Sequence, residues 1–418
     1  MPEQPALQIR TSQRDQLINR VVGLMDLVFP VSTALLFAGQ KIAAAGLLMA
    51  WLIARLIMRQ RASHGLYGLL LVLALFNAGT LVMDRGAQPS DPSDLLLIGL
   101  AFAAGLERTV DQWQRSFVQI VVCILPIGLT GLLWKPTQTL LQFPDINVNR
   151  LSFLLGILTV LAWGLNKLSR TTTGRVGWLA VTSSCIPLAL LTGSRAALAA
   201  PALAILLTEL GLGLHRLIRR GVNWKRHWRT TAAMALVIAL AVAGTAGLWY
   251  RNDQEGRINQ LSDAMRFPTS LCWASAPFNH GNPLLGLGYN REVRRHCDGR
   301  ALEVLASAKR MKGLPHAHNV PAQILGETGL IGLSGLIVAC FGIARQATRN
   351  LRPTATIQAS QCAALTASIG LPLCAYFVLT GMTTSFEIYL PLNQVLIGYS
   401  LAALFTTQSS SSQETNSP

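Results

Sequence analysis

The sequence predicts an all-α polytopic membrane protein with about twelve transmembrane helices. The chain has 418 residues, of which 51% are hydrophobic and only 13% are charged, and its mean hydropathy is +0.41. Soluble globular domains have roughly a quarter of their residues charged, so this composition argues against that class. The apolar residues lie in long runs, and one long polar stretch interrupts those runs late in the chain.

The long apolar runs define the expected helices in order. A helix needs about 17 to 25 mainly apolar residues to cross the hydrocarbon core of a bilayer. We expect transmembrane helices at 20–39, 41–58, 65–83, 94–106, 116–134, 151–166, 176–192, 196–214, 230–250, 319–344, 354–380 and 385–406. Four regions follow: an N-terminal transmembrane region (1–250, about nine helices), an external loop (251–318), a C-terminal transmembrane region (319–406, about three helices) and a disordered polar tail (407–418).

Charge along the chain predicts the orientation. The first twenty residues are too polar and too long to precede a cleavable signal, so the first span is expected to be an uncleaved anchor. Basic residues concentrate in the N-terminal segment and the even-numbered loops, which the positive-inside rule places in the cytoplasm with both termini. The basic cluster at 215–229 (HRLIRRGVNWKRHWR) indicates an anchor against anionic membrane lipids, and no nucleic-acid partner is expected.

The loop 251–318 is the one large extramembrane region. Apolar spacing in 256–278 (GRINQLSDAMRFPTSLCWASAPF) predicts short amphipathic helices on the membrane surface, followed by the turn-rich NPLLGLGYN at 282–290. The loop carries an excess of basic residues, which fits either an anionic ligand or general solubility. Cys272 and Cys297 lie in this loop, where they could form a disulfide or remain unpaired, whereas the other cysteines lie in expected spans.

The stretch LPHAHNVPAQILGETGLIGL at 314–333 places titratable groups at the entrance to the tenth span. Asn319 is a preferred N-cap and Pro321 is tolerated in a first turn, so a helix should begin here. The positive end of the helix dipole would keep the ring of His318 neutral and able to accept a proton, as a general base requires. Glu327 should lie on the helix face of Gln323, where it either orients a catalytic group or satisfies a buried polar neighbour.

No metal and no cofactor are expected. His316 lies two residues before His318, but on a turn into a helix the two rings would not point the same way. Neither a cysteine nor a carboxylate lies within a few residues to complete a site, and the chain contains no DxD pair.

Two arginines are candidate anion-binding residues. Arg195 follows Gly-Ser between two apolar runs, where a charge costs at least ~2.5 kcal/mol and is by default a functional candidate; snorkelling to headgroups is the alternative. Arg266 precedes the GLG turn in the external loop. With His318, the two guanidiniums would suit a substrate with a phosphate or diphosphate leaving group, because arginine binds phosphate oxygens in a bidentate fork.

These segments resemble the O-antigen ligase and polymerase superfamily of bacterial envelopes. The resemblance rests on TGSRAAL (192–198), an arginine followed by NPLLGLGYN in a long late loop, and HAHNVPAQILGETGLIGL (316–333). It implies a metal-independent, inverting glycosyltransferase of the bacterial inner membrane with its active site facing the periplasm. A ligase of this kind takes a polysaccharide from undecaprenyl diphosphate and passes it to the lipid A-core oligosaccharide of lipopolysaccharide.

The resemblance also implies roles for individual residues. His318 would deprotonate the acceptor hydroxyl, and Arg195 and Arg266 would hold the diphosphate, although Arg257, Arg291, Arg294 and Arg295 compete with Arg266. Supporting residues would be Asn319, Glu327, His316 and Tyr289. The alternatives are a polymerase of the same superfamily, a protein-directed oligosaccharyltransferase, and a non-enzymatic transporter or flippase of a charged lipid.

Overall fold

The fold was analysed in a computed structural model, and all described secondary structure is helical apart from one isolated bridge between Asn282 and Gly286. The structure describes residues 27–37, 41–57, 93–105, 108–134, 148–191, 195–220, 260–288, 293, 296–297, 317–352, 357–382 and 391–405. The helices are α2 (Val28–Phe37), α3 (Lys41–Ile57), α5 (Ser93–Gly105), α6 (Val110–Trp134), α7 (Val148–Leu168), α8 (Thr172–Leu191), α9 (Arg195–Arg220), α11 (Gln260–His280), α13 (Val320–Asn350), α14 (Ile357–Leu365), the π-helix η2 (Thr366–Gly370), α15 (Leu371–Gly381) and α16 (Pro391–Leu404).

Helices occupy the predicted spans wherever the structure describes them, and the helical class is confirmed for these residues. The predicted spans 65–83 and 230–250 and the tail 407–418 lie outside the described residues. Two helical stretches, Val320–Asn350 and Ala359–Gly381, are long and apolar enough to cross a bilayer. These two stretches indicate a membrane protein. Shorter apolar stretches cover Ile42–Trp51, Phe153–Leu168, Ala199–His215 and Leu392–Leu404, so a total of twelve spans stays a prediction.

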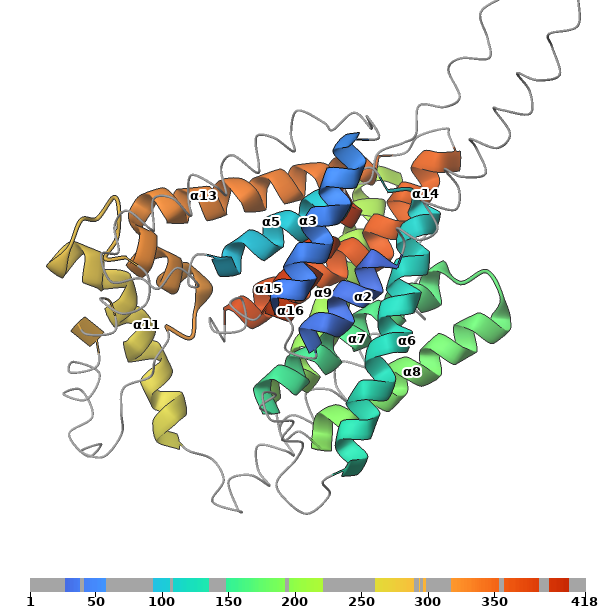
Figure 1. Cartoon of the computed structure of the whole chain (residues 1–418), viewed down its shortest axis with the longest axis horizontal. Helices are drawn as coiled ribbons and strands as arrows, with labels where there is room; N and C mark the ends of the chain where they lie inside the picture. The colour runs from blue at the N-terminus through green and yellow to red at the C-terminus, as the bar shows by residue number, and fades with distance from the viewer. Residues whose placement is uncertain are drawn as a thin grey trace, which may run out of the picture.

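Most of the helices form one bundle with an aromatic core (Figure 1). Trp113 of α6 stacks on Phe117 and meets Phe29 of α2 edge to face, with ring centroids 5.3 and 5.5 Å apart. Tyr399 of α16 packs on the same Phe29 and shares a 2.6 Å hydrogen bond with Ser32. Interdigitated rings with satisfied hydroxyls hold helices together even where lipid surrounds them, because packing and hydrogen bonds supply the attraction there.

Arg108 is buried in this bundle, although the charge pattern assigns it to a cytoplasmic loop. Its guanidinium carbon lies 3.9 Å from the ring centroid of Phe29 and 5.2 Å from that of Trp113. One of its nitrogens donates to the Ser116 hydroxyl over 2.6 Å. A delocalised guanidinium stacks on aromatic faces, and this stacking gives the arginine a place inside the core.

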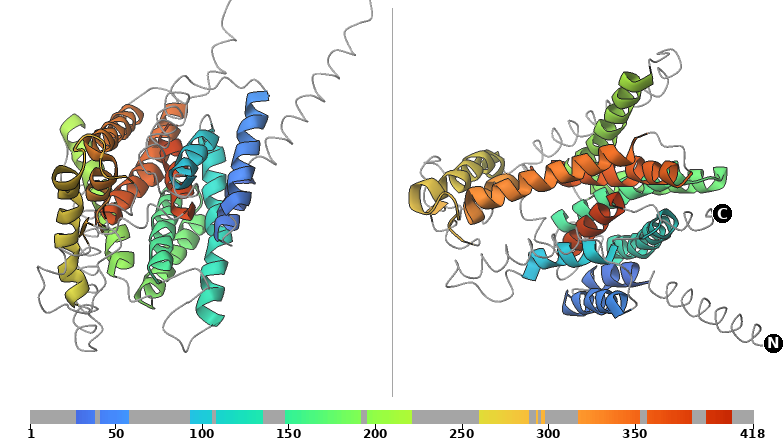
Figure 2. Two further views of the ribbon diagram at one scale, coloured as in Figure 1. Left: turned by 60° about the vertical axis from the view of Figure 1, so that its left-hand side comes forward. Right: turned by 90° about the horizontal axis from the view of Figure 1, so that it is seen from above.

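Helices α11 and α13 form a second unit beside the bundle (Figures 1 and 2). Helix α11 runs across one end of α13 rather than alongside it. Sequence predicts short helices in this part of the loop, but α11 is a single helix of 21 residues that continues through Pro268 and Pro277. Each interior proline removes a backbone hydrogen bond. We attribute the continuity of α11 to its contact with α13, which buries Thr269, Trp273 and Ala276.

Candidate functional site

The site is built around the start of α13. Asn319 has an extended backbone (φ −155°, ψ 117°), and its side-chain oxygen accepts a 3.0 Å hydrogen bond from the Ala322 amide. Its side-chain nitrogen donates to the carbonyl of Met382, which follows α15, over 3.3 Å. Asn319 therefore caps α13 and also ties the helix start to the end of α15.

His318 has a left-handed backbone, with φ 53°, and no other non-glycine residue in the described part of the chain has a positive φ. This conformation is uncommon for residues other than glycine, although histidine adopts it more often than most, and it concentrates at functional sites. The Nε2 atom of His318 is buried, and Ala317 before it is fully buried. The backbone turn and the cap fix the backbone from which this ring extends.

Gln323 and Glu327 follow on one face of α13, and both are buried, with exposed fractions of 1% and 3%. The Gln323 side-chain nitrogen donates to a Glu327 carboxylate oxygen over 2.9 Å. The Gln323 side-chain oxygen is buried and has no hydrogen-bond partner within the described structure. A buried amide oxygen without a partner costs about 1 to 3 kcal/mol, which is typical of a site that a substrate or water completes.

Neighbouring residues show where this polar face points. Gly326 packs on Trp273 of α11, since a Cβ there would lie 2.8 Å from the Trp273 carbonyl oxygen. Val320 contacts Gly381 at the end of α15. At about 100° per residue, Gln323 lies between these two faces of α13. The Gln323–Glu327 pair therefore faces the angle between α11 and α15.

Helix α11 brings Arg266 toward the same place. The Ser270 hydroxyl donates to the carbonyl of Ala317, the residue before His318, and also to the carbonyl of Arg266 over 2.8 Å. Arg266 lies one helical turn from Ser270, roughly 6 Å along the axis, and on the face of α11 that buries Trp273. Arg266 is nevertheless exposed, because the buried contact with α13 ends before it.

A disulfide joins Cys272 of α11 to Cys297, with 5.8 Å between the two Cα atoms. Sequence left this pairing open. Close by in the chain, the rings of His280 and His296 stack with centroids 4.4 Å apart. A disulfide is typical of an oxidising compartment, and this one ties α11 to Cys297.

The turn at 282–288 docks on a break in α13. Gly329 has φ 65° and ψ −161°, so the helix is interrupted there. The amides of Leu287 and Gly288 donate to the carbonyls of Gly326 and Glu327, each over 3.0 Å. In return, the amides at 330 and 331 donate to the carbonyls at 283 and 284 over 2.9 and 3.2 Å. The turn thus supplies the backbone hydrogen bonds that the interrupted helix loses; we call residues 283–288 and 326–331 the turn–helix junction.

Two glycines permit this close approach. Gly286 has φ 80°, and a Cβ there would lie 2.5 Å from the Thr328 amide nitrogen. A Cβ at Gly329 would lie 2.6 Å from the Gly286 amide nitrogen. Only glycine fits at both positions without strain or displacement of the backbone.

The remaining predicted residues are described only in part. Arg195 begins α9, but its side chain lies outside the described residues, as do His316 and Tyr289 altogether. The competing loop arginines, Arg257, Arg291, Arg294 and Arg295, also lie outside them. Helix α9 packs against α15, the helix that ends beside Asn319. The described structure therefore places His318, Asn319 and Glu327 along the start of α13 and ties α11, through Ser270, to the residue before His318, whereas the side chain of Arg195 lies outside the described residues.

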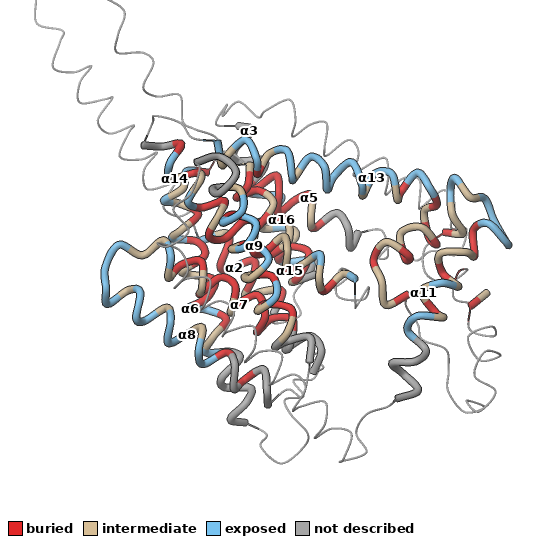
Figure 3. Tube along the Cα trace, turned by 180° about the vertical axis from the view of Figure 1, so that it is seen from behind, coloured by how far each residue is buried: buried red, intermediate tan, exposed pale blue. Residues whose placement is uncertain are grey.

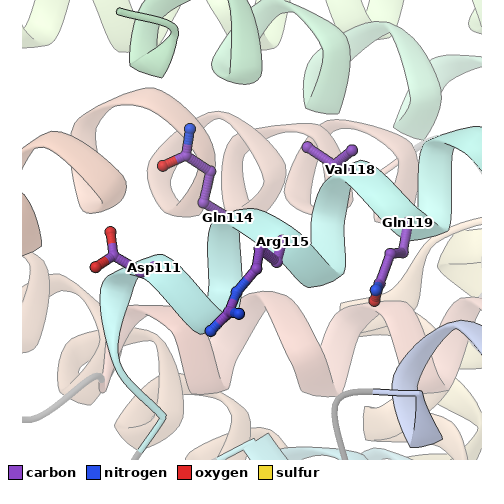
Figure 4. A pocket seen from close by; sticks show the side chains of 5 residues that line it. All are labelled: Asp111, Gln114, Arg115, Val118 and Gln119. Carbon is purple, nitrogen blue, oxygen red and sulfur yellow. The ribbon is translucent and has the colours of Figure 1, made fainter. Parts of the chain in front are cut away.

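Within the described ranges, no group of three histidine, cysteine, aspartate or glutamate side chains could hold a metal ion. A pocket of about 430 Å³ lies elsewhere, along the first turns of α6 (Figure 4). Its lining residues are Asp111, Gln114, Arg115, Val118 and Gln119. None of the predicted site residues belongs to this pocket, and α6 begins in a segment that the charge pattern assigns to the cytoplasm.

Sequence reasoning did not select Thr269, Trp273 or Gln323 as site residues. The Thr269 hydroxyl and the Trp273 ring nitrogen are buried without hydrogen-bond partners among the described residues, as is the Gln323 side-chain oxygen. Polar residues at a spacing of four on α11 were an available signal, although only the contact with α13 shows that this face is inward.

The described residues form a helical protein with two helices long and apolar enough to cross a membrane, and polar groups lie at the start of one of them, beside a disulfide-bonded helix. No protein-family model matches the chain, and no curated protein sequence matches it.

Proposed function

We propose that the chain is an O-antigen ligase that transfers a polysaccharide from undecaprenyl diphosphate to the lipid A-core oligosaccharide. The observation that carries the proposal is the position of His318, directly before the Asn319 cap, on a strained turn beside α11. A base held by its backbone, with a buried carboxylate–amide pair behind it and an arginine-bearing face beside it, fits transfer from an anionic leaving group.

In the proposed reaction the acceptor hydroxyl attacks the anomeric carbon of the donor sugar. His318 accepts the hydroxyl proton as the new carbon–oxygen bond forms, and the bond to the diphosphate breaks on the opposite face with inversion. Undecaprenyl diphosphate leaves with the electron pair, and Arg195 and Arg266 neutralise the charge that develops on it. No step requires a metal or a cofactor.

The other predicted residues act on this reaction indirectly. Asn319 positions the base through the cap, and Glu327 holds Gln323 against the angle between α11 and α15. Tyr289 and His316 are proposed as neighbours of the acceptor because they flank the junction and the cap in the chain.

The proposed setting is the bacterial inner membrane, with about twelve spans, both termini in the cytoplasm and the active site facing the periplasm. The positive-inside distribution of basic residues supports this orientation. The disulfide supports an oxidising compartment for α11, because such bonds are rare in the cytoplasm.

Two alternatives remain. A polymerase of the same superfamily would use the same base and arginines but extend the carrier-linked chain. A transporter or flippase of a charged lipid would need charged side chains deep in several spans around a central cavity. Among the described residues, the buried charged side chains are Arg108 in the bundle and Glu327 near the start of α13, rather than a set distributed over several spans, and this favours a transferase.

The primary test replaces the base. His318→Ala should lower transfer to lipid A-core by about 100- to 10,000-fold in reconstituted membranes, because a general base contributes that much to the rate. His280→Ala, at an exposed histidine of α11, is the matched control and should retain activity. If the His318→Ala protein transfers polysaccharide at the wild-type rate, His318 is not the general base.

The lipopolysaccharide ladder of a deletion strain separates the two enzymes. Bare core with carrier-linked polymer accumulating is the outcome expected for a ligase. Core capped by a single repeat would instead identify a polymerase. Bare core with carrier-linked sugar trapped on the cytoplasmic face would favour the flippase.

A further inference from the structure

The last residue of α13 ties this helix to the bundle. The Asn350 side-chain nitrogen donates to the Thr366 hydroxyl over 2.9 Å and to the Leu404 carbonyl over 2.6 Å. Its side-chain oxygen accepts from the Gln346 side-chain nitrogen over 3.1 Å, which orients the amide. Thr366 begins the π-helix η2, and Leu404 ends α16. A primary amide has two N–H donors, so both are used, and one residue joins α13, η2 and α16.

The start of α13 is tied to the other end of the helical segment that η2 begins. The elements α14, η2 and α15 follow one another without a gap, and we call η2 together with α15 (residues 366–381) the rod. Directly after the rod, the carbonyl of Met382 accepts the 3.3 Å hydrogen bond from the Asn319 side chain. Asn319 and Asn350 therefore hold the two ends of α13 at the two ends of the rod.

These two ties do not fit a straight α13. At about 1.5 Å per residue, a straight helix would place Asn319 and Asn350 roughly 46 Å apart. Along the rod, Thr366 and Met382 are only roughly 24 Å apart, and the side-chain contacts add a few ångströms at each end. The helix must therefore fold back between its ends, and the break at Gly329 is where it does so. Figure 1 shows α13 along the top of the molecule and α15 running obliquely beneath it.

The rod and the two parts of α13 form a closed triangle. Residues 320–328 make a short side of roughly 13 Å, and residues 330–350 make a long side of roughly 31 Å. Exposed residues follow most of the long side (Figure 3), so its ends, rather than packing along its length, set its position. The lengths of three stiff sides fix every angle between them. The tie at Asn350 therefore helps to set where the short side lies relative to α15, although His318 is at the opposite end of α13.

We propose that Asn350 is a positioning residue for the site at the start of α13. It closes the triangle through Thr366 and so holds the short side, with His318 and Asn319 at its tip, against the end of α15. The π-helix supports this role, because such turns are rare and occur frequently at functional sites. The structural part of the inference is independent of the proposed function, whereas the expected effect on transfer rests on it.

Hydrogen exchange of the full chain in phosphatidylcholine nanodiscs tests the structural part. Asn350→Leu keeps the size of the side chain and removes both donors. One net hydrogen bond corresponds to roughly a fivefold change in an equilibrium constant, so the amides of residues 322–328 should exchange at least about fivefold faster. Thr366→Val removes one acceptor and should act in the same direction, whereas Thr366→Ser keeps the hydroxyl and should match wild type. Thr348→Val is the control, because that exposed hydroxyl donates within α13 to the Arg345 carbonyl.

Steady-state kinetics test the positioning role. Asn350→Leu and Thr366→Val should lower kcat for transfer to lipid A-core by about fivefold or more, with KM for the acceptor unchanged within about twofold. The reason is that a misplaced base slows the chemical step, whereas the acceptor still binds. Thr366→Ser and Thr348→Val should keep the wild-type kcat.

Three outcomes would overturn the inference. Faster exchange confined to residues 346–350 and η2 would show that the tie acts only locally. A uniform increase in exchange along the whole chain, in both Asn350→Leu and Thr366→Val, would show a general loss of stability. An unchanged kcat in both variants, in an enzyme that requires His318, would refute the positioning role. If His318→Ala retains full transfer, the proposed function fails, and the exchange at 322–328 still supports or overturns the tie.

Discussion

The bundle and the α11–α13 unit are held together in different ways. In the bundle, large rings such as Trp113, Phe29 and Tyr399 fill the core, and buried hydroxyls find partners on neighbouring helices. In the α11–α13 unit the buried cluster is small, with Trp273 as its one large side chain among the described residues. Backbone hydrogen bonds, a disulfide and two glycine contacts supply the cohesion instead.

This difference indicates where the molecule tolerates change. Side-chain packing distributes stability over many contacts, so that a single loss in the bundle is partly absorbed by its neighbours. The α11–α13 unit depends on a few connections, each without a substitute. The proposed base, the cap and the buried Gln323–Glu327 pair all lie in that unit. Backbone hydrogen bonds, rather than the packing of large side chains, hold its geometry.

Among the variants that test this comparison, Gly329→Ala should affect both stability and activity. A methyl group at this left-handed position would meet the backbone at 284 and 286, at a cost of about 2 to 4 kcal/mol. We expect the junction to open and transfer activity to fall at least about tenfold. Gly335→Ala, in the same helix with open space around its Cα, should be neutral in both assays. Equal activity and thermal stability of the two variants would show that the break is not needed.

Loss of the disulfide should be nearly as costly. Closing the loop between Cys272 and Cys297, 25 residues apart, stabilises the folded chain by about 3.5 kcal/mol in the chain-entropy model. In the double variant Cys272→Ala/Cys297→Ala, hydrogen exchange should quicken in α11 and stay unchanged in α6. Cys340→Ala, at an exposed free cysteine, is the control. If hydrogen exchange quickens equally in α11 and α6, the two parts of the molecule are not stabilised separately.

A smaller effect is expected at the cap. Asn319→Ala removes the acceptor of the Ala322 amide and should destabilise the start of α13 by about 1 kcal/mol. Asn319→Ser keeps a capping oxygen and should recover most of that loss, while still lacking the bond to Met382. The turnover number for transfer, measured beside thermal unfolding, should follow the order wild type, serine variant, alanine variant. If the alanine variant is as active as the serine variant, the cap does not help to position His318.

The smallest effect belongs to the bundle. Tyr399→Phe deletes the hydroxyl shared with Ser32, whose own hydroxyl still donates to the Phe29 carbonyl over 3.0 Å. We expect a loss of roughly 0.5 to 1 kcal/mol in global stability and no change in activity. A double-mutant cycle with Ser32→Ala measures the pair directly. If Tyr399→Phe lowers transfer activity without a matching loss of stability, the bundle core influences the site.

The helices and the start of α13 could be predicted from sequence because their signals are local. Apolar runs fixed the expected spans, and α9 and α13 begin within one residue of the predicted 196 and 319. The Asn319 cap and the shared face of Gln323 and Glu327 follow from spacing alone. No distant partner has to be known for any of these inferences.

The break in α13 and the length of α11 could not be predicted because distant residues decide them. Gly329 is one of several glycines in an apolar run, and only the turn at 283–288 makes it the site of an interruption. Pro268 and Pro277 favour short helices locally, but packing on α13 overrides that preference. The contact of α11 with the residue before His318 likewise depends on the bond from Ser270 to Ala317, which no local pattern encodes.

The turn–helix junction has a consequence for biogenesis. During membrane insertion, a broken α13 without its turn would expose the carbonyls of Gly326 and Glu327 and the amides of Leu330 and Ile331 to lipid. The newly inserted helix should therefore pass the translocon unbroken, with Gly329 in a helical conformation. In the proposed orientation, the interruption forms only when residues 283–288 lie on the same side of the membrane as Gly329, so a broken α13 requires that this loop has already been translocated.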